Sequence, residues 1–250
     1  MRRLVVSLAV LALVGFMPAD RAAADNDHRL RAVPHTFVGT APGCAPTPPG
    51  SHIVTAAWLS GMGLPDNDGP NTNTTPEQRA DRRSGLLLSK NGLTTDCSSA
   101  SAEIKGVRGM EVTATFELGF DYRNGGHCGA GSPRFNVTVR NAGVETSHFV
   151  GGCANDTSPT PAPQDTAQWT RVRFQTASAA EAFPPLPVGS RIVSIELIVD
   201  EGTDSVSTQD PMGVGLSVVD NIFINGKFIR SGNNNRDRHD DEDEDEGDED

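Results

Sequence analysis

Asp220 is the residue whose surroundings most need a chemical explanation. It lies in a segment that alternates with a period of two, as half-buried strands do. It is in phase with the apolar side chains of that segment, which are Val214, Leu216, Val218, Ile222 and Ile224. A carboxylate among apolar side chains is costly unless it is hydrogen-bonded or coordinates a cation. Hydrogen bonds from backbone N–H groups are one way to stabilise a carboxylate at this position. A structural Ca²⁺ is the other, with Asp200, Asp204 and Asp210 as further carboxylates close in sequence.

A second group of polar side chains lies in a glycine-rich loop over residues 121–134. Such a loop can form a polar pocket, or it can be a structural connection whose glycines permit tight turns. The candidate ligand-binding residues in it are Asp121, Arg123, Asn124 and His127. Catalysis is not indicated, because His127 has no identifiable nucleophile as its partner.

Trp169 begins an alternating segment in which Val172 and Phe174 form the apolar face. It is in phase with Arg171 and Arg173, which occupy the other face. An exposed aromatic ring can stack on the C–H face of a sugar, so Trp169 with these two arginines is a candidate ligand platform. The alternative is a bulge that turns the indole into the core.

No pattern of catalytic residues accompanies these candidates. The G-x-S-x-G, H-E-x-x-H and Walker patterns are all absent from the chain. A glycosidase needs two carboxylates across a cleft, and the spacing of the carboxylates along the strands selects no such pair. We therefore expect no enzymatic activity.

These residues must be positioned by strands. Short alternating segments are separated by Gly, Pro, Asn and Asp throughout residues 51–230, and helical patterns are almost absent. Two packed antiparallel sheets bury such alternating faces economically, so the expected fold is an all-β antiparallel β-sandwich. The expected inner faces include Phe135, Val137 and Val139 in one strand. In a later strand they are Val193, Ile195, Leu197 and Val199.

The four cysteines are even in number, and in an exported protein this indicates disulfides. Cys128 and Cys153 flank residues 134–140 and 144–150, which resemble the arms of a hairpin that turns at 141–143. Pairing the arms brings these two cysteines together. Cys44–Cys97 is then the second pair by elimination.

The two ends of the chain differ from the domain between them. Residues 1–24 have the basic, apolar and small-residue regions of a signal peptide, and residues 25–50 are expected to be an irregular leader. Residues 231–250 are dense in acidic side chains and supply most of the net charge of −12. We expect this tail to be disordered. An acidic chain lacks the basic surface that nucleic acid requires, and no later segment is long and apolar enough to span a membrane.

The order of elements after Trp169 is similar to that of a known family. Residues 169–174 form a strand and residues 187–189 a turn, and an acidic loop at 200–204 then precedes Val219-Asp220-Asn221-Ile222. This order resembles the C-terminal half of galactose-binding-like jelly rolls, which include many carbohydrate-binding modules. The resemblance implies a jelly-roll topology, a carbohydrate ligand and a role for Asp220 in holding a structural Ca²⁺. Residues 119–137 also look like part of an uncharacterised bacterial secreted family.

The resulting hypothesis is a secreted, non-catalytic binding module for carbohydrate or another cell-surface polymer. The alternatives are an extracellular structural or surface-interaction protein and, third, a hydrolase on the same fold.

Overall fold

The computed structural model describes residues 30–38, 53–65, 84–208 and 210–229. Within these ranges the chain consists of β-strands, turns and two short 3-10 helices, η1 (Thr94–Asp96) and η2 (Cys153–Asn155). The all-β fold expected from the period-two alternation is confirmed. No helix in the described part of the chain is long and apolar enough to cross a membrane.

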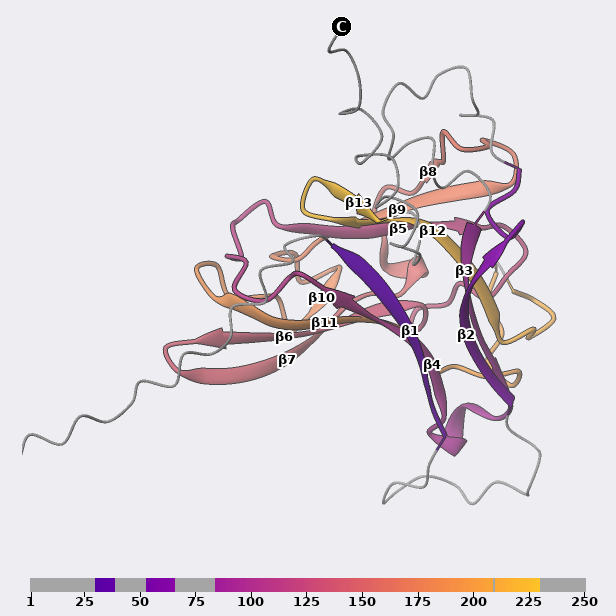
Figure 1. The fold of residues 1–250 in the computed structure, drawn as a ribbon, viewed down its shortest axis with the longest axis horizontal. Coiled ribbons are helices and arrows are strands. Elements are labelled where there is room, and N and C mark those ends of the chain that lie inside the picture. The colour runs from indigo at the N-terminus through magenta and orange to yellow at the C-terminus, as the bar shows by residue number, and fades with distance from the viewer. Residues whose placement is uncertain (1–29, 39–52, 66–83, 209, 230–250) are drawn as a thin grey trace, which may run out of the picture.

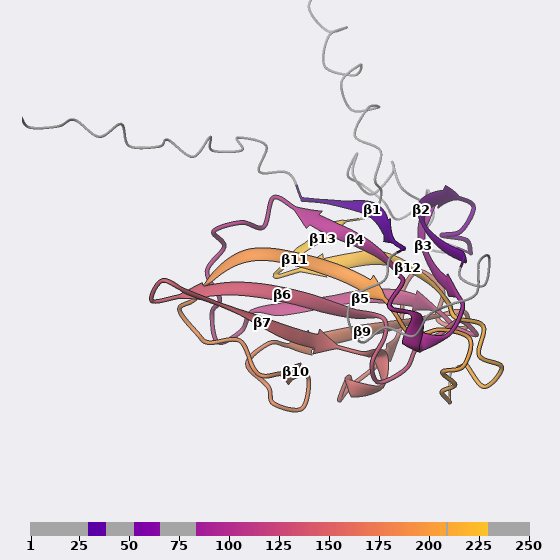
Figure 2. The same cartoon turned by 90° about the horizontal axis from the view of Figure 1, so that it is seen from below.

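The strands form two antiparallel sheets that pack face to face, as Figure 1 shows from the edge and Figure 2 shows after a quarter turn. Sheet A contains, in spatial order, β1 (Arg31–Phe37), β4 (Ser99–Lys105), β11 (Arg191–Val199), β6 (Arg134–Asn141), β7 (Val144–Gly151) and β10 (Ala182–Phe183). Sheet B contains β2 (Ile53–Ser60), β3 (Ser84–Asn91), β12 (Leu216–Ile224), β5 (Glu117–Arg123), β9 (Trp169–Gln175) and β8 (Thr160–Pro161), and β13 (Lys227–Ile229) pairs with β12.

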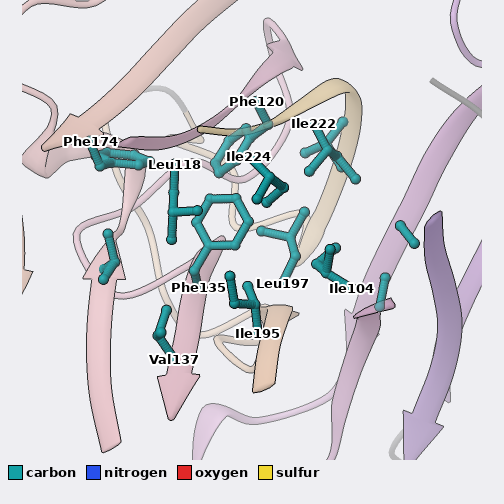
Figure 3. Packing of buried hydrophobic residues seen from close by; sticks show 14 of the residues in the cluster. Ile104, Leu118, Phe120, Phe135, Val137, Phe174, Ile195, Leu197, Ile222 and Ile224 are labelled. Atoms are coloured by element: carbon teal, nitrogen blue, oxygen red, sulfur yellow. The ribbon is translucent and has the colours of Figure 1, made fainter. Parts of the chain in front are cut away.

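The inner faces of the two sheets meet in one main hydrophobic core (Figure 3). At its centre, Phe120 of sheet B lies with its ring centroid 5.8 Å from that of Phe135 in sheet A and 6.0 Å from that of Phe174. The rings are tilted, as aromatic pairs prefer. Val137 and Val139 are buried on the same face as Phe135, as predicted. Apolar burial of this kind supplies most of the driving force for folding.

Strand β12 contains a β-bulge at Asn221, whose φ is 46°, and its register against β5 shifts between Asp220 and Phe223. Because side chains alternate with a period of two, one extra residue sends those that follow to the opposite face. Val219, Ile222 and Ile224 all enter the main core. The prediction of one shared face is therefore wrong for Val214, Leu216, Val218, Ile222 and Ile224.

The bulge places Leu216 and Val218 on the outer side of sheet B. There they form a second, smaller apolar cluster with Ala162 and Trp169. Asp220 also lies on this outer side, in phase with Leu216 and Val218, so its carboxylate does not enter the main core. The apolar neighbours predicted for Asp220 are real, but they belong to this second cluster.

Strand β11 has a similar irregularity, since its register against β6 shifts between Ile192 and Ser194. Ile195, Leu197 and Val199 are buried in the main core, as predicted. Val193 is not, because the irregularity brings Ile192 into the core in its place.

The segment that precedes the domain also differs from the expectation. The sequence predicts an irregular leader over residues 25–50, but β1 lies within them and pairs with β4 along its whole length, from Arg31↔Lys105 to Phe37↔Ser99. The sandwich domain therefore begins before residue 51. The predicted signal peptide and acidic tail lie outside the described residues.

The hairpin formed by β6 and β7 turns through Ala142 and Gly143, both with positive φ (49° and 83°), which matches the right-handed twist of the strands. It brings Cys128 and Cys153 to a Cα–Cα distance of 5.2 Å, and the predicted disulfide between them is confirmed. Cys97 is also disulfide-bonded. Its predicted partner, Cys44, lies outside the described residues.

Candidate functional site

The candidate residues fall into two separate groups. One group lies on the outer face of sheet B and at its margin, and the other lies in the loops that follow β5 and β11. The first contains Trp169, Arg171, Arg173, Asp121, Arg123, Asn124 and Asp220, and the second contains His127, Asp200 and Asp204.

Trp169 faces the outer side of sheet B, as its phase predicted, but it is fully buried. Its ring packs in the second apolar cluster, and its Nε1 donates a hydrogen bond to the backbone oxygen of Pro65 at 3.1 Å. Met62, from the segment before Pro65, also packs against this cluster. The prediction of an exposed stacking platform at Trp169 is therefore wrong, because loops remote in sequence cover the ring.

Asp121 is fully buried, and its carboxylate is compensated by neighbouring donors. Arg171 binds it in a bidentate manner, with Nε–Oδ1 and Nη2–Oδ2 distances of 2.8 Å. Asn221 donates from Nδ2 to Oδ2 at 3.1 Å. Such paired, charge-assisted hydrogen bonds are strong and geometrically specific. Asp121 and Arg171 therefore satisfy each other.

Arg173 is held between backbone and aromatic groups. Its Nη1 donates to the backbone oxygen of Val172 at 2.7 Å, and its guanidinium carbon lies 4.7 Å from the ring centroid of Phe223 and 5.6 Å from that of Phe228. Burial lowers the pKa of Arg173 to about 10, although the nearby charge of Asp121 opposes this. The side chain of Arg173 therefore keeps its positive charge at neutral pH. Its contact with Phe228 links β9 to β13.

Asp220 is 4% exposed and is hydrogen-bonded. Its Oδ1 accepts from the backbone N–H of Asn221 at 2.7 Å, and its Oδ2 accepts from Nε2 of Gln164 at 3.1 Å. Gln164 in turn accepts from Nδ2 of Asn221 at 3.0 Å, which joins this network to Asp121. Hydrogen bonds therefore account for the buried carboxylate of Asp220. The bulge orients the backbone N–H of Asn221 toward this carboxylate.

Arg123 and Asn124, at the end of β5, hold neighbouring loops. Arg123 donates to the backbone oxygen of Leu64 and, at 3.3 Å, to Oε1 of Gln168. Asn124 accepts a hydrogen bond from Oγ1 of Thr170 at 2.7 Å. Both side chains are committed to contacts within the domain.

His127 is 1% exposed and contacts a carboxylate with each ring nitrogen. Its Nδ1 lies 3.1 Å from Oδ2 of Asp210, and its Nε2 lies 2.8 Å from Oε2 of Glu201. Burial alone would lower the pKa of His127, but the hydrogen bonds and charges of Glu201 and Asp210 outweigh it and hold the pKa above its usual value. The imidazolium joins the loop after β5 to the loop after β11.

Asp200 and Asp204 lie in the same loop as Glu201, and both are engaged with protein donors. Arg134 binds Asp200 in a bidentate manner at 2.7 and 2.6 Å. Asp204 accepts from the backbone N–H of Thr94 at 2.7 Å, which is the main reason that its pKa is lowered. Asp220 belongs to the other group and shares none of these partners. No set of three or more His, Cys, Asp or Glu among the described residues is arranged to hold a metal ion, and the calcium site stays a prediction.

A buried lysine was not anticipated. The side chain of Lys90 is fully buried, and its Nζ lies 3.0 Å from Oδ1 of Asp96. The same ammonium donates to the backbone oxygens of Thr94 at 3.0 Å and Asp200 at 2.9 Å. Burial alone would raise the pKa of Asp96, but hydrogen bonds from Ser98 and Lys90 hold it below its usual value.

A sequence signal for this buried lysine did exist. Lys90 is in phase with Leu86 and Leu88, which are both fully buried in the same strand. An inward-facing lysine in such a strand requires an acidic partner. The partner could not be identified without knowing how the chain folds back after η1.

The outer face of sheet A is different, because many of its side chains are exposed. Alternation in β6 and β7 buries Phe135, Val137 and Val150, so the intervening side chains point outward. The β6–β7 platform is our name for the outward-facing residues Asn136, Thr138, Ser147, Phe149, Phe183 and Ser194. Sequence reasoning missed this surface. The one indication of it in the sequence is Phe149, a large apolar residue that must face outward because its neighbour Val150 faces the core.

The aromatic part of the platform is a cross-strand pair. Phe149 of β7 lies directly opposite Phe183 of β10, and the two side chains are 50% and 43% exposed. The guanidinium of Arg134 lies 4.9 Å from the ring centroid of Phe149, which orients that ring. Two adjacent exposed rings at the margin of a polar sheet are available for a ligand.

The polar part of the platform is a row of hydroxyl groups across three strands. Ser194 pairs with Thr138, and Thr138 pairs with Ser147. None of the three hydroxyls makes a hydrogen bond to another residue that the structure describes. They are free to bind a ligand that carries donors and acceptors.

A histidine on the same sheet does not form a catalytic triad. Nε2 of His35 lies 2.9 Å from Oε1 of Glu196 and 3.1 Å from Oγ of Ser101. A nucleophile-activating histidine contacts the hydroxyl with one ring nitrogen and the carboxylate with the other. Here one nitrogen contacts both, so the arrangement does not serve acyl transfer.

No protein-family model, curated protein or solved structure matches this chain.

We predict that His127 makes stability depend on pH. Because its folded-state pKa is raised, its contribution is complete below the unfolded-state pKa of about 6.5 and is lost as the pH rises through the folded-state value. The free energy of unfolding, measured with urea from about pH 6 to about pH 9, should therefore fall more steeply in the wild type than in His127→Gln. The exposed His35→Gln variant is the control. Equal slopes in the wild type and His127→Gln would contradict this role.

Asp220→Ala is predicted to lower the free energy of unfolding by about 1–3 kcal/mol, because buried donors of Gln164 and Asn221 lose their acceptor. Urea denaturation with EDTA and again with Ca²⁺ tests this. A loss of stability already present in EDTA is the expected result. A loss that appears only with Ca²⁺ would instead support the predicted metal site.

Proposed function

We propose that this protein is a secreted, non-catalytic module that binds a carbohydrate polymer on the β6–β7 platform. The observation that carries the proposal is the exposed pair Phe149–Phe183 beside a row of free hydroxyl groups on an open sheet face. Aromatic rings match the C–H faces of sugars, and hydroxyl and amide side chains match their O–H groups.

The size of the platform suits a polymer. The four strands β11, β6, β7 and β10 span about 14 Å at a spacing of about 4.8 Å, and Asn136 to Arg140 spans about 13 Å along β6. An area of this size accommodates several sugar units in a row. An exposed sheet face can contact several units of a chain, whereas it does not enclose a single sugar.

The outer face of sheet B is a poor alternative location. Trp169, Asp121 and Asp220 are buried there under the loops at 61–65 and 162–165, and their polar atoms are bound to each other or to backbone. A ligand would have to displace these contacts. The open face of sheet A requires no such rearrangement.

Export is supported by the chemistry of the cysteines. The described cysteines, Cys97, Cys128 and Cys153, are all in disulfides, which persist in oxidising compartments outside the cytosol. The basic and apolar start of the sequence agrees with an export signal.

A second candidate function is interaction with a protein surface. The loop between β11 and β12 exposes Val206 (65%), Met212 (83%) and Val214 (43%). Exposed apolar side chains favour a protein partner where they form one patch. In that case the domain would be a structural or surface-interaction module, and the β6–β7 platform would have no ligand.

The double variant Phe149→Ala/Phe183→Ala tests the proposed function. We expect it to weaken polysaccharide binding by about tenfold or more, because each stacked ring contributes about 0.5–1.5 kcal/mol beyond its buried area. Affinity electrophoresis in gels that contain soluble β-glucan, xylan, galactan or pectin measures the effect, and sedimentation with insoluble cellulose and chitin extends the panel.

The matched control is Phe37→Ala, which removes a ring of similar exposure from β1 at the opposite edge of the same sheet. It should bind as the wild type does. If the wild type binds no polysaccharide of the panel, the proposal is wrong and the protein-interaction function takes its place. Loss of binding in Phe37→Ala but not in the double variant would place the ligand elsewhere.

A further inference from the structure

A cavity of about 340 Å³ lies at the end of sheet A where the β6–β7 hairpin turns. Three chain segments line it: 108–109 before β5, 140–143 in the hairpin turn, and 189–193 at the start of β11. Cavities of this volume are at the lower end of the range of small-ligand sites. This one adjoins the β6–β7 platform.

Three arginines, one from each segment, line the cavity, namely Arg108, Arg140 and Arg191. Arg140 and Arg191 are register partners on β6 and β11. Positively charged side chains that lie close together repel one another unless anions compensate them. Their arrangement therefore favours a negatively charged ligand.

The carboxylates of the domain compensate these charges only in part. Arg140 pairs with Glu145 and Arg191 pairs with Glu111, the latter at 3.0 Å, and all four side chains are about half exposed. Exposed pairs of this kind contribute little stability, so a ligand can replace them at small cost. Arg108 is exposed and makes no hydrogen bond or ion pair with any described residue.

The walls between the arginines leave room for a ligand. Gly109, Gly143 and Gly189 all line the cavity, and a Cβ atom added at any of them would meet no atom within 4 Å. Open space therefore lies beside the backbone at all three positions. An anionic group can therefore approach Arg108 directly, and it reaches Arg140 and Arg191 by replacing the exposed carboxylates of Glu145 and Glu111.

The cavity and the platform form one continuous surface. Arg140 follows Asn136 and Thr138 on the outer side of β6, about 13 Å from Asn136. The hydroxyl row of Ser194, Thr138 and Ser147 lies between the aromatic pair and the arginines. A chain that stacks on Phe149 and runs along β6 reaches Arg140.

We infer that this cavity binds the carboxylate or sulfate group of an acidic polysaccharide, whose neighbouring sugars occupy the β6–β7 platform. Guanidinium groups bind both anions through paired, charge-assisted hydrogen bonds. The inference rests on the proposed carbohydrate-binding function and specifies its ligand class. Because the net charge of the chain is −12, attraction at long range does not assist binding, and short-range contacts with the arginines supply the selectivity.

Isothermal titration calorimetry of the full chain with matched pairs of polysaccharides tests the inference. One pair is polygalacturonate and its methyl ester, which compares a carboxylate with a neutral group. The other is heparin and desulfated heparin, which tests the sulfate. We expect the wild type to bind at least one acidic polymer about tenfold more tightly than its less charged counterpart, because only the acidic member forms charge-assisted hydrogen bonds with the arginines.

Arg108→Gln should remove most of that preference, about tenfold, because it deletes the one arginine of the cavity that lacks a carboxylate partner among the described residues. The control is Lys227→Gln, which removes the same charge from the exposed strand β13 of the other sheet. Equal binding of both members of each pair, or an equal effect of the two variants, would overturn the inference.

These outcomes separate the inference from the proposed function. If neutral and acidic polymers bind equally and Phe149→Ala/Phe183→Ala still loses binding, the carbohydrate function stands and the acidic ligand is wrong. If the wild type binds no polysaccharide at all, both fail. If the preference is retained in Arg108→Gln, the acidic ligand is bound away from the cavity, which also overturns the inference.

Discussion

The structure depends on the burial of one face of each strand in a single core between two sheets. A strand has only two faces, so every residue that does not enter the core must face outward, where loops or solvent meet it. Phe120, Phe135 and Phe174 occupy the centre of that core and fix the distance between the sheets. The two outer faces are then free to differ, and they do.

The outer face of sheet B is closed. The bulge at Asn221 directs Leu216 and Val218 outward, and together with Trp169 they require an apolar cover, which the chain around Met62 and Ala162 provides. The buried carboxylates beside them are compensated by a hydrogen-bond network. On the outer face of sheet A, Phe149 and Phe183 stay 50% and 43% exposed, and this asymmetry is the basis for placing a ligand there.

The loops that follow β5 and β11 are held by buried charges. His127, Lys90 and Arg134 each bind carboxylates or backbone oxygens of the segment that begins at Asp200 or of the segment around η1. The Cys128–Cys153 disulfide ties the same region to the end of β7. Removing one partner of a buried ion pair lowers stability by far more than the intact pair contributes to it. These contacts therefore fix how the loops are arranged more than they add to stability.

Local features of the fold could be predicted from the sequence, and features that depend on strand order could not. Alternation identified the inner face of β6, and the hairpin turn identified the disulfide, because both follow from neighbours in the chain. The bulge at Asn221 could not be predicted, because the apolar residues before and after it keep almost the same spacing as in an uninterrupted strand. The burial of Trp169 under Pro65 escaped because that contact joins residues 104 positions apart. The pairing of His127 with Glu201 escaped for the same reason, since it joins residues 74 positions apart.

The central claim is that the open face of sheet A is the binding surface. Backbone amide chemical shifts, recorded while an oligosaccharide fragment of the tightest-binding polysaccharide is added, test it most directly. The account predicts that the largest changes occur in β6, β7, β10 and the start of β11, including Thr138 and Phe149, while Trp169 and Asp220 are unaffected. Changes confined to the outer face of sheet B, or to the loop that contains Met212, would contradict it.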